Sequence, residues 1–125
     1  MRLMNYWESL IESLLRYRRA VGVIVAGSLN LDYVIKLNRF PEPGETLTGL
    51  DLKTYPGGKG LNQAVAAARA GAKVAMIGNL GNDAAAQVLK NVISSENILS
   101  NFVKNVEGPT GAAYIEVDNN SRNRI

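Results

Sequence analysis

The sequence predicts an α/β fold in which strands and helices alternate along the chain. Three observations carry this prediction. A nearly continuous apolar run at 21–26 is typical of a buried parallel strand. A glycine-rich turn at 56–60 leads directly into small residues at helical spacing. A second helical pattern follows at 82–95.

The first predicted strand, near 21–28, is followed by the polar side chains of Asn30 and Asp32. In an extended segment these side chains point the same way, about 7 Å apart, so both could face one small polar molecule. Ligands of open α/β sheets bind outside the carboxyl ends of the strands, which is where this pair lies. The alternative is an Asx turn, in which both side chains satisfy only nearby backbone groups.

Further strands are expected near 33–37, 46–54, 74–79 and 111–118. Residues 33–37 and 50–55 alternate apolar with polar side chains, a pattern that suits a sheet covered on one side only.

The segment 56–64 places two glycines and a lysine directly before a helix. Glycines allow the main chain to approach a ligand closely, and the first turn of a helix offers unpaired N–H groups. Neither the P-loop pattern nor the dinucleotide-binding pattern is present, because Leu61 follows Gly60 and the exit of the first strand has one glycine. The alternative is a tight turn without a ligand.

Two helices are predicted. The first runs from about Leu61 to Ala70, stops at Gly71 and has an apolar stripe made by Leu61, Val65 and Ala68. The second begins at Asn82 or Asp83 as N-cap and runs to about Ser95. Its apolar stripe, which predicts a core face, consists of Ala85, Val88, Leu89, Val92 and Ile93.

Residues 1–20 form a separate amphipathic N-terminal extension in this interpretation. Basic residues follow its apolar stripe, which consists of Tyr6, Trp7, Leu10, Ile11, Leu14 and Leu15. The segment is too short and too charged to span a membrane, and Glu8 and Glu12 argue against a transit peptide. We expect it to pack loosely, or to cover exposed sheet or a second copy; a role at a membrane surface is the weakest alternative.

Composition restricts the classes of function. With 125 residues, 46% of them hydrophobic, the chain can form one modest core. A net charge of +3 without a dense basic patch, together with 6% aromatic residues, argues against nucleic-acid binding. The absence of cysteine and histidine excludes disulfides, thiolate chemistry and imidazole metal sites. These features suit a cytoplasmic enzyme that works through carboxylate, amide and magnesium.

Five segments together resemble the N-terminal part of the ribokinase (PfkB) family of sugar kinases. They are residues 21–32, 40–46 (Phe-Pro-Glu-Pro-Gly-Glu-Thr), 56–69 (beginning Pro-Gly-Gly-Lys-Gly-Leu-Asn-Gln-Ala), 78–83 (Gly-Asn-Leu-Gly-Asn-Asp) and 108–113 (Gly-Pro-Thr-Gly-Ala-Ala). The resemblance implies the N-terminal part of a doubly wound α/β sheet domain with a small β lid. Residues 21–125 would be the sugar-binding half of such a domain with its lid strands.

The resemblance also implies an activity, the transfer of the ATP γ-phosphoryl group to D-ribose, with Mg²⁺ and activation by a monovalent cation. The catalytic aspartate and the nucleotide site of the family are expected beyond Ile125, so no catalytic residue is assigned here. Two alternatives stay open: a non-catalytic fragment that binds sugar or dimerises, and a kinase of the same family for another pentose or a nucleoside.

The resemblance implies a sugar site made of Asn30, Asp32, Gly57, Gly58, Lys59 and Asn62. The polar side chains would bind ribose hydroxyls and the two glycines would bring bare backbone against the sugar. Ala113 and Ile115 would be the lid residues above the sugar, although Ala112 and Tyr114, of the other parity, are not excluded. Lid strands often form the dimer interface in this family, so the resemblance is compatible with a homodimer through these strands, while the sequence alone does not give the oligomeric state.

Overall fold

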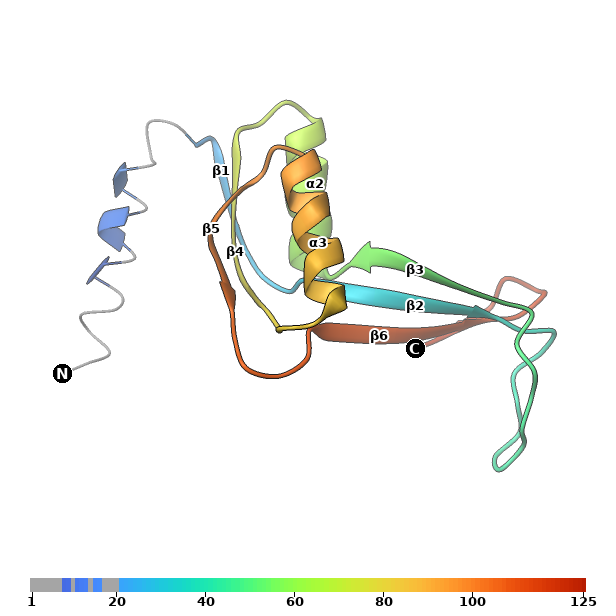
Figure 1. The fold of residues 1–125 in the computed structure, drawn as a ribbon. Helices are drawn as coiled ribbons and strands as arrows, with labels where there is room; N and C mark the ends of the chain where they lie inside the picture. Colours follow the sequence, from blue (N-terminus) through green and yellow to red (C-terminus); the bar gives the residue numbers. More distant parts are fainter. Residues whose placement is uncertain (1–7, 10, 14, 17–20) are drawn as a thin grey trace.

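A computed structural model describes residues 8, 9, 11–13, 15, 16 and 21–125 of the chain. Its centre is a parallel sheet of three strands in the order β1 (Val23–Ala26), β4 (Val74–Leu80) and β5 (Leu99–Asn105). Helices α2 (Lys59–Arg69) and α3 (Ala84–Ser95) lie on one face of this sheet (Figure 1). Each helix follows a strand, as the alternating pattern of the sequence predicts.

A second sheet extends from the first as an arm (Figure 1). We call it the mixed sheet, and its strand order is β3 (Asp51–Gly57), β2 (Asn30–Lys36), β6 (Gly111–Val117) and β7 (Asn123–Arg124). The β2–β6 pair is parallel, whereas the β2–β3 and β6–β7 pairs are antiparallel. Because β2 follows β1 and β6 follows β5, the mixed sheet begins at the carboxyl edge of the parallel sheet.

The core lies between the parallel sheet and the two helices. Its largest fully buried side chains are Leu61, Met76, Leu80, Leu89, Ile93 and Val74. Leu29 and Leu31 join the same cluster from the start of the mixed sheet. One continuous apolar core therefore fixes the mixed sheet against the helices.

Pairing between strands, more than local pattern, decides where β2 and β3 begin and end. The strand expected at 33–37 begins earlier, at Asn30, because β2 pairs over its whole length with both β3 and β6. The strand expected at 46–54 is wrong in its first half, because β3 begins at Asp51 and continues to Gly57. β5 and β7 were not predicted from the sequence.

Helix α3 begins as predicted, with Asp83 as N-cap, and α2 is followed by Gly71 in a positive-φ conformation (φ 91°). Among the described residues, however, the predicted core stripe of α3 is wrong at Val88, which is 42% exposed. Ala86, Leu89 and Ile93 are the buried residues of this helix. The buried stripe is therefore displaced toward Ala86 and away from Val88, while Ala85 and Val92 are half-buried.

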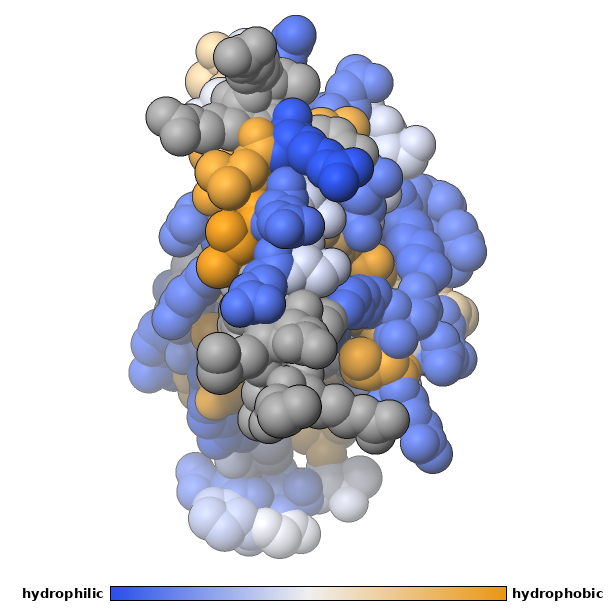
Figure 2. Space-filling model, turned by 90° about the vertical axis from the view of Figure 1, so that its left-hand side faces the viewer, coloured by the Kyte–Doolittle hydropathy of each residue, from blue (hydrophilic) through white to orange (hydrophobic). Residues whose placement is uncertain are grey.

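The N-terminal extension is described only in part. Residues 8, 9, 11–13, 15 and 16 are helical, and Ile11 and Leu15 are 52% and 56% exposed. The other members of the predicted apolar stripe lie outside the described residues. Figure 2 looks at this side of the molecule and shows apolar residues at the surface among mostly hydrophilic ones. No helix among the described residues is long and apolar enough to cross a membrane.

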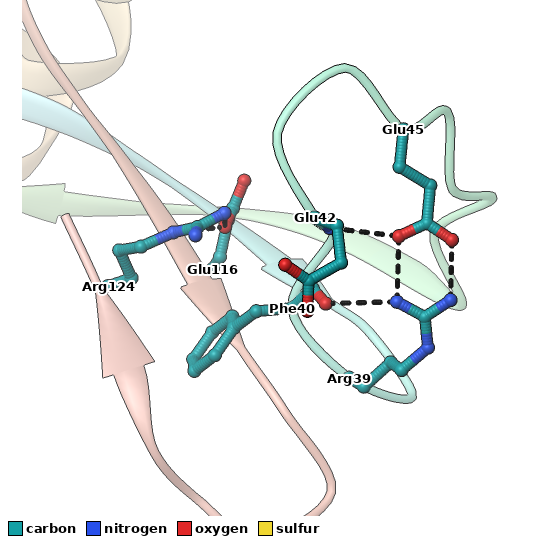
Figure 3. A network of polar contacts seen from close by, with 6 residues as sticks. All are labelled: Arg39, Phe40, Glu42, Glu45, Glu116 and Arg124. Carbon is teal, nitrogen blue, oxygen red and sulfur yellow. Dashed lines mark hydrogen bonds and ion pairs between the residues drawn. The ribbon is translucent and has the colours of Figure 1, made fainter.

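A polar network holds the far end of the mixed sheet (Figure 3). Arg39 Nη1 donates to Glu45 Oε2 at 2.7 Å, and the Glu42 N–H donates to the same oxygen at 2.9 Å. The hydrogen bond from Arg39 lowers the pKa of Glu45 to about 2. The guanidinium of Arg124 lies 5.0 Å from the centre of the Phe40 ring, so the β2–β3 loop is in contact with β7.

Replacing Leu89 tests the core. Leu89→Ala removes a fully buried side chain and is expected to lower the free energy of unfolding by about 2–5 kcal/mol, because a cavity remains between α3 and the sheet. Val88→Ala, at the exposed neighbour, is the matched control and should change it by less than about 0.5 kcal/mol. Urea unfolding followed by circular dichroism measures both variants. Equal losses in the two would contradict this packing.

Candidate functional site

The exit of β1 and the glycine-rich turn before α2 lie in direct backbone contact. The Leu61 N–H donates to the carbonyl oxygen of Ser28 at 3.0 Å. A Cβ added to Gly58 would lie 2.6 Å from that oxygen, and one added to Gly60 would lie 2.7 Å from the carbonyl carbon of Gly27. Glycine is therefore required at both positions, and at Gly58 a φ of 93° requires it a second time. The segment that follows β1 and the glycine-rich turn before α2, which the sequence singles out separately, therefore lie side by side in the fold.

One face of the mixed sheet carries the polar residues of this place. Asn30 and Asp32 are extended residues of β2, so their side chains share a face, and the Asx-turn alternative is wrong. Asn30 pairs in register with Gly57 on one side and Gly111 on the other. Neither neighbour of Asn30 in this row has a side chain, so backbone alone flanks Asn30 at the root of the sheet, and we call this place the hollow.

The next rows of the same face continue along the arm, away from the helices. Asp32 stands between Tyr55 and Ala113, and the row beyond it contains Val34 between Lys53 and Ile115. Ala113 and Ile115 thus share the face of Asp32. Tyr114 is on the opposite face, where its ring stacks on Tyr33 with centroids 5.2 Å apart. The alternation of side chains along β6 therefore places Ala113 and Ile115 on the face of Asp32, and Ala112 and Tyr114 on the opposite face.

Lys59 and Asn62 lie on the first turn of α2, beside the hollow. Both are exposed, and the backbone N–H of Asn62 donates to the carbonyl oxygen of Gly58 at 3.0 Å. The structure thus brings Asn30, Asp32, Gly57 and Gly58 together, whereas the side chains of Lys59 and Asn62 are exposed on the first turn of α2. Gly58, as N-cap of α2, provides no side-chain cap for the helix, and the Leu61 N–H of the first turn is paired with the carbonyl oxygen of Ser28 instead.

A polar cluster that joins Asp83 to the buried Thr110 fixes the start of β6 next to the hollow. Asp83 Oδ1 accepts from the Thr110 hydroxyl at 2.6 Å and from the Ala86 N–H at 2.9 Å, and Oδ2 accepts from the Thr110 N–H at 2.8 Å. The Gly81 N–H donates to Thr110 Oγ1 at 3.0 Å. The hydroxyl of Thr110, then the two backbone N–H groups, lower the pKa of Asp83. Sequence reasoning missed the role of Thr110, although the turn at 108–111 marks it.

A separate cavity of about 490 Å³ lies between the helices and the end of β3. It is lined by Pro56, Leu61, Asn62, Val65, Ala66, Arg69 and Val92. Asn62 is the one candidate site residue among these, and Pro56 stands in register with Leu31, on the opposite face from Asp32. The cavity is therefore distinct from the hollow beside Asn30. No group of three or more metal-ligating side chains occurs among the described residues.

Comparison with known proteins identifies the family. A family model described as pfkB family carbohydrate kinase matches residues 22–125. The chain belongs to the pfkB carbohydrate kinase family. The match includes both sheets, helices α2 and α3, and the five segments that carry the resemblance in the sequence, apart from Val21 at the start of the first segment.

Relatives within this family carry the name ribokinase. The Haemophilus influenzae ribokinase is 47% identical over 102 residues, which are 81% of this chain and 33% of the relative. The Bacillus subtilis ribokinase is 38% identical over 95 residues, which are 75% of this chain and 32% of the relative. The chain therefore spans about a third of the length of the curated relatives it matches.

Solved structures confirm the predicted fold. Ribokinase from Thermotoga maritima matches with a TM-score of 0.78 and 38% identity, covering 83% of this chain and 35% of that one. Arabidopsis thaliana ribokinase complexed with ribose and ATP matches with a TM-score of 0.75 and 29% identity, covering 83% of this chain and 34% of that one. The α/β architecture of ribokinases, with the arm formed by the mixed sheet, is thus the fold of this chain.

The cluster around Asp83 makes stability depend on pH. Because the pKa of Asp83 is lower when folded, its contribution is present above the ordinary value and is lost as the pH falls below about 4. Asp83→Asn should lower the melting temperature at pH 7 and flatten its fall between pH 5 and 3, relative to the unchanged chain. Glu107→Gln, at an exposed carboxylate near Thr110, is the control. If both variants follow the unchanged chain across this range, Asp83 does not stabilise the junction.

Proposed function

We propose that this chain provides the sugar-binding half of a carbohydrate kinase that phosphorylates D-ribose. The observation that carries the proposal is the hollow at the root of the mixed sheet, where Asn30 and Asp32 share one face with the glycine-rich turn at 57–58. The name ribokinase on relatives up to 47% identical supports ribose as the sugar. A solved relative titled as complexed with ribose and ATP supports both substrates.

The chemistry of the hollow suits a polyhydroxyl ligand. The carboxylate of Asp32 accepts hydrogen bonds from hydroxyls, and the amide of Asn30 both donates and accepts them. Gly57 and Gly58 bring bare backbone to the ligand, while Lys59 and Asn62 reach it from the first turn of α2. Ala113 and Ile115 give the lid an apolar surface toward the carbon skeleton of the sugar, and this combination of apolar walls with few polar groups is typical of small-molecule sites.

We place the remaining machinery outside these 125 residues, in the part of the relatives that this chain does not cover. Phosphoryl transfer needs a group that accepts the hydroxyl proton and a metal-bound nucleotide, which Mg²⁺ and ATP would supply. Asp32 is assigned to sugar binding and not to proton transfer. The isolated chain is accordingly expected to bind sugar without phosphorylating it.

We also propose that the lid strands of the mixed sheet form a homodimer interface. The surface of this sheet carries exposed apolar side chains, with Tyr114 at 64% and Leu52 at 62% exposure. Apolar surface of this kind often marks an interface. Light scattering at increasing concentration should show a dimer, and Tyr114→Arg should shift the equilibrium toward monomer. A monomer at all concentrations would contradict this proposal and leave the sugar site unaffected.

Substitutions at the hollow test the sugar site. Asp32→Ala and Asn62→Ala should each weaken D-ribose binding by about 1–3 kcal/mol, because hydroxyls of the bound sugar lose their partners. Calorimetric titration measures the affinity, and titration with other pentoses and with nucleosides measures the preference for ribose. Asp51→Ala is the matched control. Asp51 lies on the same face of the sheet as Asp32, but at the far end of β3, where its carboxylate forms an ion pair with Lys53.

The outcomes separate the candidate functions. Unchanged affinity in both Asp32→Ala and Asn62→Ala would contradict the assigned site. A nucleoside or another pentose that binds more tightly than ribose would keep the site and replace the substrate. A folded chain that binds ribose but transfers no phosphoryl group, even within a longer protein, would favour a binding module.

A further inference from the structure

Two glycines stand beside the two polar side chains of the hollow at distances that leave no room for a methyl group. A Cβ added to Gly111 would lie 2.4 Å from Asn30 Oδ1 and 3.2 Å from its Cγ. A Cβ added to Gly57 would lie 2.1 Å from Asp32 Oδ2 and 2.4 Å from its Cγ. Ordinary carbon contacts lie at 3.5–4.0 Å. Each glycine therefore occupies a place into which the neighbouring polar side chain projects.

The backbone does not require glycine at these two positions. The described glycines with positive φ are Gly44, Gly58, Gly71 and Gly108, and neither Gly57 nor Gly111 is among them. Both are strand residues, in a conformation that any residue adopts. What requires glycine here is the side chain on the adjacent strand.

The contacts also differ from those of the glycines in the turns. A Cβ on Gly58, Gly60 or Gly81 would meet backbone atoms, so that a substitution there displaces the main chain. A Cβ on Gly111 would first meet the amide end of Asn30. Rotation of that amide relieves the contact while the strands stay paired. A side chain at position 111 is therefore expected to change the orientation of the Asn30 amide and to leave the backbone in place.

We infer that Gly57 and Gly111 are positioning residues, which hold the Asp32 carboxylate and the Asn30 amide in the orientation that binds the sugar. The inference rests on the proposed function, since it assigns a role within the same site. Hydrogen bonds to hydroxyls require distances of 2.5–3.2 Å and weaken steeply when misaligned. An amide turned away by a methyl group loses them without any loss of the residue itself.

Gly111 gives the cleaner test, because Gly57 is buried and Gly111 is exposed. Four forms of the full chain are compared by calorimetric titration with D-ribose: unchanged, Asn30→Ala, Gly111→Ala and the double variant. Gly111→Ala should lose roughly tenfold or more in affinity. The double variant should bind within about twofold of Asn30→Ala, because the methyl group has no amide left to displace.

Gly22→Ala is the matched control, since a Cβ there meets its nearest neighbour, the carbonyl oxygen of Lys73, at an ordinary 3.8 Å. It should bind ribose like the unchanged chain. Wild-type affinity in Gly111→Ala would overturn the inference, and so would losses that multiply in the double variant. Unchanged affinity in Asn30→Ala would instead count against Asn30 as a sugar contact in the proposed function, which separates the two failures.

A second measurement decides the matter if the isolated chain binds no sugar. In the presence of Asn30, Gly111→Ala should lower the midpoint of urea unfolding, because either the amide or the strand must move. In the Asn30→Ala background the same substitution should leave the midpoint unchanged. Equal shifts in both backgrounds, or no shift in either, would show that Gly111 does not act through Asn30.

Discussion

The close backbone approach between the exit of β1 and the turn before α2 is the constraint on which the rest of the structure depends. Gly58 and Gly60 lie so near Gly27 and Ser28 that any side chain on them would meet main-chain atoms. This contact sets where α2 begins, and through it where β3 ends and β2 starts. Because β3 runs directly into α2, the pairing of Asn30 with Gly57 follows from the same contact. The helix, the sheet and the candidate sugar site share one fixed point.

A second anchor holds the other side of the hollow. Asp83 caps α3 and binds both the hydroxyl and the N–H of Thr110, directly before Gly111 in β6. The mixed sheet is thus tied to the core at both of the strands that flank β2. Its far end, by contrast, is held by surface ion pairs such as Arg39–Glu45 (Figure 3), which contribute little each. This distribution places the rigid part of the arm at the hollow, where a binding site benefits from it.

Much of this fold follows from local sequence, and the remainder follows from pairing. The Asp83 N-cap and the stop at Gly71 each have a local physical cause, and the structure has them where the sequence predicts them. β1 lies within its apolar run, but the prediction of a buried strand is wrong, because β1 is an edge strand in which only Val25 is buried and Ile24 is 45% exposed. β5 lacks a regular alternation and could not be found in this way. The position of Asn30 and Asp32 after the first strand was predicted from the sequence. The close approach of Gly111 to the Asn30 side chain was not predicted, because it depends on the register of β2 with β6.

The measurement that tests the central claim most directly is amide chemical-shift mapping by NMR during titration of the chain with D-ribose. The account predicts that the largest saturable changes occur at the backbone amides of residues 30–32, 57–59 and 111–113, which surround the hollow at the root of the mixed sheet. Changes confined to the cavity near Val65 and Val92, or no saturable change in a folded chain, would contradict it.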